Sequence, residues 1–138
     1  MKYLLTLIQE GNYFLVSSQD IPELNSVGES VEDALKEALD GIESAFMIYM
    51  EDRIPIPLPS ARPKEGEYFV TLPLLVAAKV YLYNEMLAQN VTKAELARRL
   101  DWQQKQADRL LSLKHATKIE SIENAFHAMG RELDLQVA

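Results

Sequence analysis

The sequence predicts an α+β protein in which a small β-β-α-β domain, residues 1–72, precedes an all-helical domain, residues 73–138. Three observations support this division. Two β-rich runs flank a Gly/Asn turn near the start of the chain, and an amphipathic helical pattern follows them. Four prolines fall within residues 53–66, where they exclude a regular helix or a central strand. Beyond Pro73 nearly all of the periodicity is helical.

The sheet of the first domain is expected to have three strands. Residues 2–8 and 13–18 are rich in β-branched, aromatic and leucine side chains, and the Glu-Gly-Asn at residues 10–12 predicts a hairpin turn between them. A loop is expected at residues 20–24. Residues 68–72 predict the third strand, after the proline-rich crossover.

One long helix is expected to cover this sheet. Ser30 is followed three residues later by Asp33, a spacing typical of a helix N-terminus. Apolar residues then recur at helical spacing as far as Tyr49, while acidic residues gather mostly on the other side, and the helix should end near Asp52.

Four helices and a short final strand are predicted for the second domain. The helices are expected to span the following residues: 74 to about 89, 93–100, about 104–112, and from a capping box at Thr117 to a stop at Gly130. Residues 133–137 alternate apolar and polar side chains, which predicts a half-buried strand.

Residues 91–113 have the features of a helix-turn-helix. Two helices can cross steeply only where a small side chain lies between them, and Ala97 provides one. Leu96, Leu100, Ala107 and Leu110 supply apolar contacts. Asp101 falls at the turn, where a positive φ is usual and aspartate is tolerated less readily than glycine.

The outer face of the predicted helix at residues 104–112 predicts DNA binding, because glutamine suits the adenine edge and arginine or lysine suits guanine. Thr92 and Lys93, at the start of the predicted helix at residues 93–100, are placed to meet a phosphate. Asp108 lies on the same side and weakens the basic character. The candidate DNA-binding residues are Thr92, Lys93, Gln103, Gln104, Lys105, Gln106, Arg109 and Lys114.

The net charge of −7 is divided unevenly along the chain. Residues 1–73 contain 5 basic and 13 acidic side chains, whereas residues 90–118 contain 7 basic and 3 acidic ones. This division suggests two partners of opposite charge. The chain has no cysteine, no signal peptide and no run of membrane-spanning length, so a cytoplasmic protein is expected.

No catalytic or metal site is predicted, so we expect no enzyme activity and no cofactor. The acidic side chains of the long helix have no acidic residue opposite them in residues 2–8, so a solvated helix face is favoured over a two-metal nuclease site. The two histidines, His115 and His127, fall on different elements and lack a matching acid or thiol.

Residues 92–130 resemble the Cro/repressor-type helix-turn-helix domains, through the pattern T-x-x-E-L-A-R-R-L and the closing A-F-x-A-M-G. The first half resembles the N-terminal domain of HicB-type antitoxins of bacterial toxin–antitoxin pairs, in the order and spacing of several short segments. They are residues 3–8, 11–13, 20–24, 28–34, 46, 49–52 and 56–60.

The resemblance implies a partial ribonuclease H-like fold for residues 1–72. It also implies a HicA-type toxin as partner, a small basic mRNA-cleaving protein, and repression of the pair's own operon through double-stranded operator DNA. Repressors of this type usually act as homodimers. The toxin-contacting residues are unknown, and the candidates are Asp20, Glu32, Asp33, Glu37 and Asp40.

Three alternatives remain open from the sequence. The protein could be a stand-alone transcriptional regulator whose first domain senses a ligand or partner. It could be a degenerate nuclease, or an orphan repressor that has lost its toxin. The last residues of the chain, 133–137, could pair with a second copy or dock on their own domain.

Overall fold

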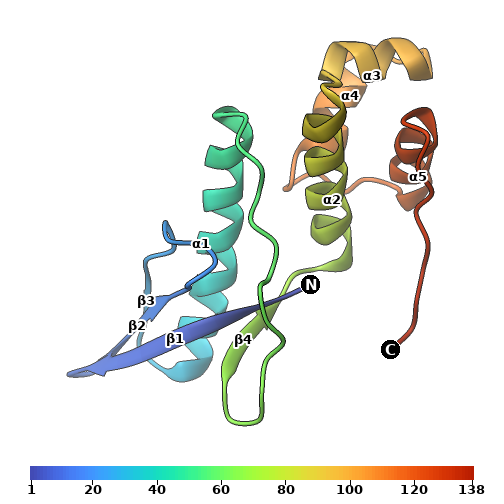
Figure 1. Ribbon diagram of the computed structural model, residues 1–138. Helices are drawn as coiled ribbons and strands as arrows, with labels where there is room; N and C mark the ends of the chain where they lie inside the picture. Colours follow the sequence, from blue (N-terminus) through green and yellow to red (C-terminus); the bar gives the residue numbers. More distant parts are fainter. The chain divides into compact units, whose positions relative to one another are not determined.

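An antiparallel sheet followed by helices makes this an α+β protein, as predicted. The computed structural model describes residues 1–138, and Figure 1 traces them from blue to red. They form two units, Met1–Pro73 and Leu74–Ala138. The first contains every strand and one helix, and the second contains only helices.

The sheet of the first unit has four antiparallel strands in the order β3-β2-β1-β4. Their bounds are β1 Lys2–Glu10, β2 Tyr13–Ser17, β3 Ser26–Gly28 and β4 Tyr68–Thr71. The hairpin and the last strand are confirmed, but the expected count of three strands was wrong. Strand β3 has three residues with a single large apolar side chain, so it is too short to show the alternation that identifies a strand.

Helix α1, Val31–Glu51, begins where the sequence predicts. The Ser30 hydroxyl accepts a hydrogen bond from the Asp33 amide at 3.0 Å, and the Asp33 carboxylate accepts one from the Glu29 amide at 2.9 Å. Just before this cap, β3 passes very close to the helix. A Cβ at Gly28 would lie 2.3 Å from the Ala34 nitrogen, so only glycine fits there.

The core of the first unit lies between α1 and one face of the sheet. Tyr3 of β1 is fully buried, and its ring packs on Phe46 of α1 with centroids 5.8 Å apart. The Tyr3 hydroxyl donates to the Pro57 carbonyl at 2.7 Å. Ile56 beside that proline is also buried, so the proline-rich segment is anchored to the core rather than loose.

The opposite face of the sheet is open. Ile8, Leu15 and Val27 are cross-strand neighbours in one row. They are 57%, 37% and 50% exposed, respectively. The adjacent row faces α1, because its member Ser26 donates to the Glu37 carbonyl of that helix.

The second unit contains four helices: α2 Leu74–Gln89, α3 Lys93–Leu100, α4 Gln104–Leu111 and α5 Ile119–Ala128. The first three begin at the expected residues, and Gly130, at φ 71°, follows the end of α5 as predicted. Side chains from all four helices fill the core, among them Leu82, Leu96, Leu110 and Ile122.

Two expectations for the second unit are corrected. Helix α5 is capped by Lys118 rather than Thr117, because the Thr117 hydroxyl turns back toward the Arg109 and His115 carbonyls, 3.5 and 3.4 Å away. Residues 133–137 form no strand in this chain. A strand needs a neighbour to pair with, and the second unit contains none, so Leu135 and Val137 stay exposed.

Candidate nucleic-acid interface

Helices α3 and α4 pack through small and apolar side chains. Leu96, Ala97, Ala107 and Leu110 are all buried, as the sequence predicts, whereas Leu100 is half-buried. Thr92 is the N-cap of α3, and its hydroxyl accepts a hydrogen bond from the Glu95 amide at 3.1 Å. The two alanines allow the helices to approach closely.

The turn between these helices depends on a left-handed residue. Asp101 has φ 55° and ψ 42°, which confirms the positive φ expected at this position. The chain reverses there so that the Trp102 amide donates to the Ala97 carbonyl at 2.8 Å. Only three residues therefore separate the end of α3 from the start of α4.

The outer face of α4 is polar and exposed. Its exposed side chains are Gln104, Lys105, Gln106, Asp108 and Arg109, and the N-cap residue Gln103 is exposed as well. Gln106 has a second role, because its carboxamide oxygen accepts from the Gln103 amide at 2.9 Å and so caps the helix. The other α4 candidates keep their polar groups on the surface.

Asp108 engages two of the candidate DNA-binding residues. Its Oδ1 lies 3.5 Å from the Lys93 ammonium and accepts from the Gln104 amide at 3.4 Å. Both ion-pair partners are about half exposed, so this pair contributes little stability and DNA could displace it. The sequence placed Asp108 on this face but could not identify its partners.

The two arginines of α3, Arg98 and Arg99, are both paired with Glu95. Glu95 accepts from Arg98 at 2.6 Å and from Arg99 at 3.0 Å. Hydrogen bonds from Arg98 and then Arg99 lower the pKa of Glu95 to about 2. Arg99 also donates to the Ala128 carbonyl at 3.3 Å, which links α3 to the end of α5.

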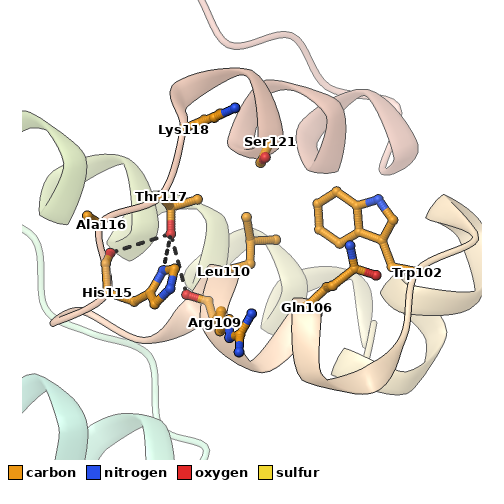
Figure 2. A pocket seen from close by; sticks show the side chains of 9 residues that line it. All are labelled: Trp102, Gln106, Arg109, Leu110, His115, Ala116, Thr117, Lys118 and Ser121. Carbon is orange, nitrogen blue, oxygen red and sulfur yellow. Dashed lines mark hydrogen bonds between the residues drawn. The ribbon is translucent and has the colours of Figure 1, made fainter.

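A shallow pocket lies between α4 and the start of α5 (Figure 2). Arg109 and Lys118 contribute basic side chains to its lining, together with His115, Trp102 and Ser121. Lys118, the residue before α5, makes no side-chain cap, so the first amides of α5 have no side-chain acceptor from it. Trp102 and Ser121 were not identified from the sequence, because their approach depends on how α5 packs against α4.

The acidic candidates of the first unit divide into two groups. Asp33 serves the helix cap, and Asp20 accepts from the Ser60 amide at 3.0 Å, which ties the proline-rich segment to the loop after β2. Glu32, Glu37 and Asp40 are exposed on α1.

The last DNA-binding candidate of the second unit, Lys114, is exposed just beyond α4.

None of the five helices has the length and apolar character needed to cross a membrane. No group of three or more histidine, aspartate or glutamate side chains is arranged to hold a metal ion.

Known proteins resemble this chain over nearly its whole length. A family model described as HicB-like antitoxin of bacterial toxin–antitoxin systems matches residues 2–81. Antitoxin HicB of Pseudomonas fluorescens is 42% identical over 136 residues, covering 99% of this chain and 93% of the relative. Antitoxin HicB of Escherichia coli is 43% identical over 137 residues, covering 98% of each. Antitoxin HicB 2 of Photorhabdus laumondii is 42% identical over 135 residues, covering 98% and 95%. The chain therefore belongs to the HicB family of antitoxins of bacterial toxin–antitoxin systems.

Proposed function

We propose that this chain neutralises a HicA-type toxin with its first unit and represses its own operon with its second. The first unit would be a partial ribonuclease H-like fold used for binding rather than catalysis. The second would be a helix-turn-helix in which α4 enters the major groove of operator DNA. Both partners would be met in the cytoplasm.

The observation that carries the DNA proposal is the division of α4 into a buried and an exposed side. Ala107, Leu110 and Leu111 are buried, while the polar side chains lie outward on a helix held by a short turn. A solvated helix needs no such set of amide and guanidinium donors, whereas base edges in a major groove match them. Arg109, Gln104 and Lys105 would read bases.

Residues around α4 would hold the DNA backbone. Thr92 and Lys93 lie at the start of α3, where helix amides and a cation favour an anion. The basic side chains of the pocket in Figure 2 and Lys114 would contact phosphates beyond α4. Lys93→Ala should therefore weaken binding to all sequences alike and reduce the salt dependence.

Footprinting directly tests the proposal that the chain binds its operator. The full chain is titrated onto DNA from upstream of its own gene and onto an unrelated fragment of equal length. The proposal expects protection of two half-sites about one helical turn apart on the upstream DNA alone. Equal affinity for the two fragments at every salt concentration would contradict operator recognition.

The toxin half is supported by the exposed stripe of α1. The acidic side chains Glu32, Glu37 and Asp40 occupy its N-terminal half. Met47 and Ile48 are 37% and 52% exposed toward its other end. A basic RNA-binding protein suits such a surface, because opposite charges speed encounter and apolar contacts then slow dissociation.

A three-site variant tests this surface. The chain carrying Glu32→Gln, Glu37→Gln and Asp40→Asn is compared with a control carrying Glu10→Gln, Glu65→Gln and Glu132→Gln, which removes the same charge elsewhere. Binding to the product of the adjacent toxin gene is measured by titration calorimetry. We expect at least a tenfold weaker complex for the α1 variant only. Equal losses in both variants would show that net charge alone acts.

A homodimer is proposed to place the two recognition helices on the half-sites. The chain end is the candidate joint, because Leu135 and Val137 are 75% and 87% exposed in one copy and alternate with polar residues. Pairing of two such ends would satisfy both edges. Gel filtration of a chain ending at Gly130 should give a monomer, and an unchanged dimer would exclude this joint.

The second candidate function is a stand-alone regulator whose first unit senses a ligand. The open sheet face with its Ile8, Leu15 and Val27 row is the feature that favours it. Co-purification decides between the two functions. A small basic protein bound to the chain favours the antitoxin, and a bound metabolite with no protein partner favours the regulator.

A further inference from the structure

Lys79 on α2 is a charged side chain with no exposed surface, and it is the one charged residue among the buried residues. Burying an ammonium group without compensation is costly, which is why lysine is rarely found in a protein core. Burial lowers the pKa of Lys79 to about 8. Such a group needs strong partners nearby if the folded chain is to keep it charged.

The partners of Lys79 are three main-chain carbonyls at the end of α4. The Lys79 Nζ donates to the carbonyl oxygens of Ser112 at 2.5 Å, His115 at 2.8 Å and Arg109 at 3.2 Å. An ammonium group has three N–H donors, so each is matched by one acceptor. Arg109 is in the last turn of α4, Ser112 is its C-cap, and His115 belongs to the turn before α5.

These contacts replace a feature that the other helices have. A left-handed residue follows α1, α2, α3 and α5 closely: Arg53, Asn90, Asp101 and Gly130. Such a residue lets the following amides bond the last carbonyls of a helix. Helix α4 has no such residue, and its C-cap Ser112 is extended, with φ −75° and ψ 117°. The Arg109 and Ser112 carbonyls also accept from the Ser112 and His115 amides, both at 3.2 Å, so Lys79 is a second donor to each of them and the charged one.

A cation at this point also suits the helix itself. The C-terminus of a helix carries partial negative charge, which a nearby ammonium stabilises. Helix α4 has eight residues, and helices of that length are not stable in water without tertiary support. Lys79 therefore supplies a positive charge at the end of α4 and adds charged hydrogen bonds to carbonyls whose other donors, amides and the Thr117 hydroxyl, are neutral.

We propose that Lys79 is a positioning residue for DNA recognition, which holds the last turn of α4 and the turn that follows it in the geometry that operator binding requires. It bonds the main chain of Arg109 itself, so a shift at this point would move that side chain in the groove. It also bonds the main chain of His115, one of the residues that line the pocket. This inference rests on the proposed DNA-binding function.

The test compares Lys79→Met with Lys64→Met in the full chain. Methionine keeps the length of the lysine stem but donates to no carbonyl, and Lys64 lies on an exposed loop of the first unit. Dissociation constants are measured on operator and on unrelated DNA, at a temperature where circular dichroism shows each variant folded. We expect Lys79→Met to bind the operator about 5- to 150-fold more weakly, the range that corresponds to one lost base contact.

Comparing the affinity for the operator with the affinity for unrelated DNA shows whether Lys79 positions α4 or only stabilises the fold. Lys79→Met should change binding to unrelated DNA much less than binding to the operator, and Lys64→Met should change neither. If Lys79→Met does not fold, Lys79→Gln carries the test, because its amide keeps two donors and should give an intermediate loss. Wild-type operator affinity in a folded Lys79 variant would overturn the inference, whereas failure of the unmodified chain to bind DNA would overturn the proposed function.

Discussion

Asp101 shows how one residue decides the geometry of the proposed interface. It occupies the left-handed region that glycine adopts most easily, and the turn from α3 to α4 passes through it. Asp101→Gly should therefore stabilise the chain by up to about 1 kcal/mol, and Asp101→Val should destabilise it by more than about 1 kcal/mol. Urea unfolding of the three proteins checks this, and a valine variant as stable as the wild type would contradict it.

Tyr49 of α1 predicts a dependence of stability on pH. Burial, and then its hydrogen bond to the Glu23 carboxylate, raise the pKa of Tyr49 from 10.0 to about 12. Because the folded value is the higher one, the protonated phenol contributes stability that is fully present below pH 10 and is lost as the pH rises through 12.

The comparison with Tyr49→Phe isolates this contribution. The wild type should exceed the variant in free energy of unfolding at pH 8, because the variant leaves Glu23 without its donor. That difference should shrink between pH 10 and 12. A difference that stays constant over the whole range would show that the phenol ionises equally in the folded and unfolded chains.

At the scale of elements, the sequence predicted most helix starts because their signals are local. Ser30 and Thr92 each cap a helix, because the side-chain oxygen accepts a hydrogen bond from the amide three residues later. Thr117 has the same local pattern, yet its hydroxyl turns toward carbonyls at the end of α4. A cap thus fails where a tertiary partner competes for the same side chain.

The two errors in the strands have a common physical cause. Strand β3 exists because β2 offers it an edge, and residues 133–137 remain irregular because no edge is offered in their unit. Pairing partners are distant in the sequence, so a short segment cannot reveal them. The same limit applies to the interface, where the exposure of α4 follows from its period but the Lys79 and Asp108 contacts do not.

The crossing of β3 and α1 gives a prediction for an element pair. Gly28→Ala would place a Cβ against the Ala34 nitrogen, so the strand or the helix must move, at a cost of about 1–3 kcal/mol. Gly11→Ala is the control, because no atom lies within 4 Å of its added Cβ and only the positive φ opposes it. Thermal unfolding should rank the wild type first, Gly11→Ala second and Gly28→Ala last. A Gly28→Ala protein that matches the control would show that the contact relaxes freely.

At the scale of the whole molecule, the uneven distribution of charge is consistent with the two functions proposed for the two units. Residues 1–73 hold 13 of the 21 acidic side chains, and the basic side chains concentrate around α3 and α4. An acidic unit is suited to a basic toxin, and a locally basic surface is suited to DNA. The net charge of −7 would oppose DNA binding if it were spread evenly along the chain. Because most of the acidic side chains lie in the first unit, the surface around α4 keeps a charge that favours DNA.

Operator binding by a chain carrying Gln104→Ala, Lys105→Ala and Arg109→Ala tests this account most directly. The three side chains are exposed on α4 and lie outside the core, so the variant should fold normally and still bind the toxin. We expect it to lose discrimination between operator and unrelated DNA, since each lost base contact is worth about 1–3 kcal/mol. Wild-type affinity for the operator in this variant would contradict the assignment of α4 as the helix that reads DNA.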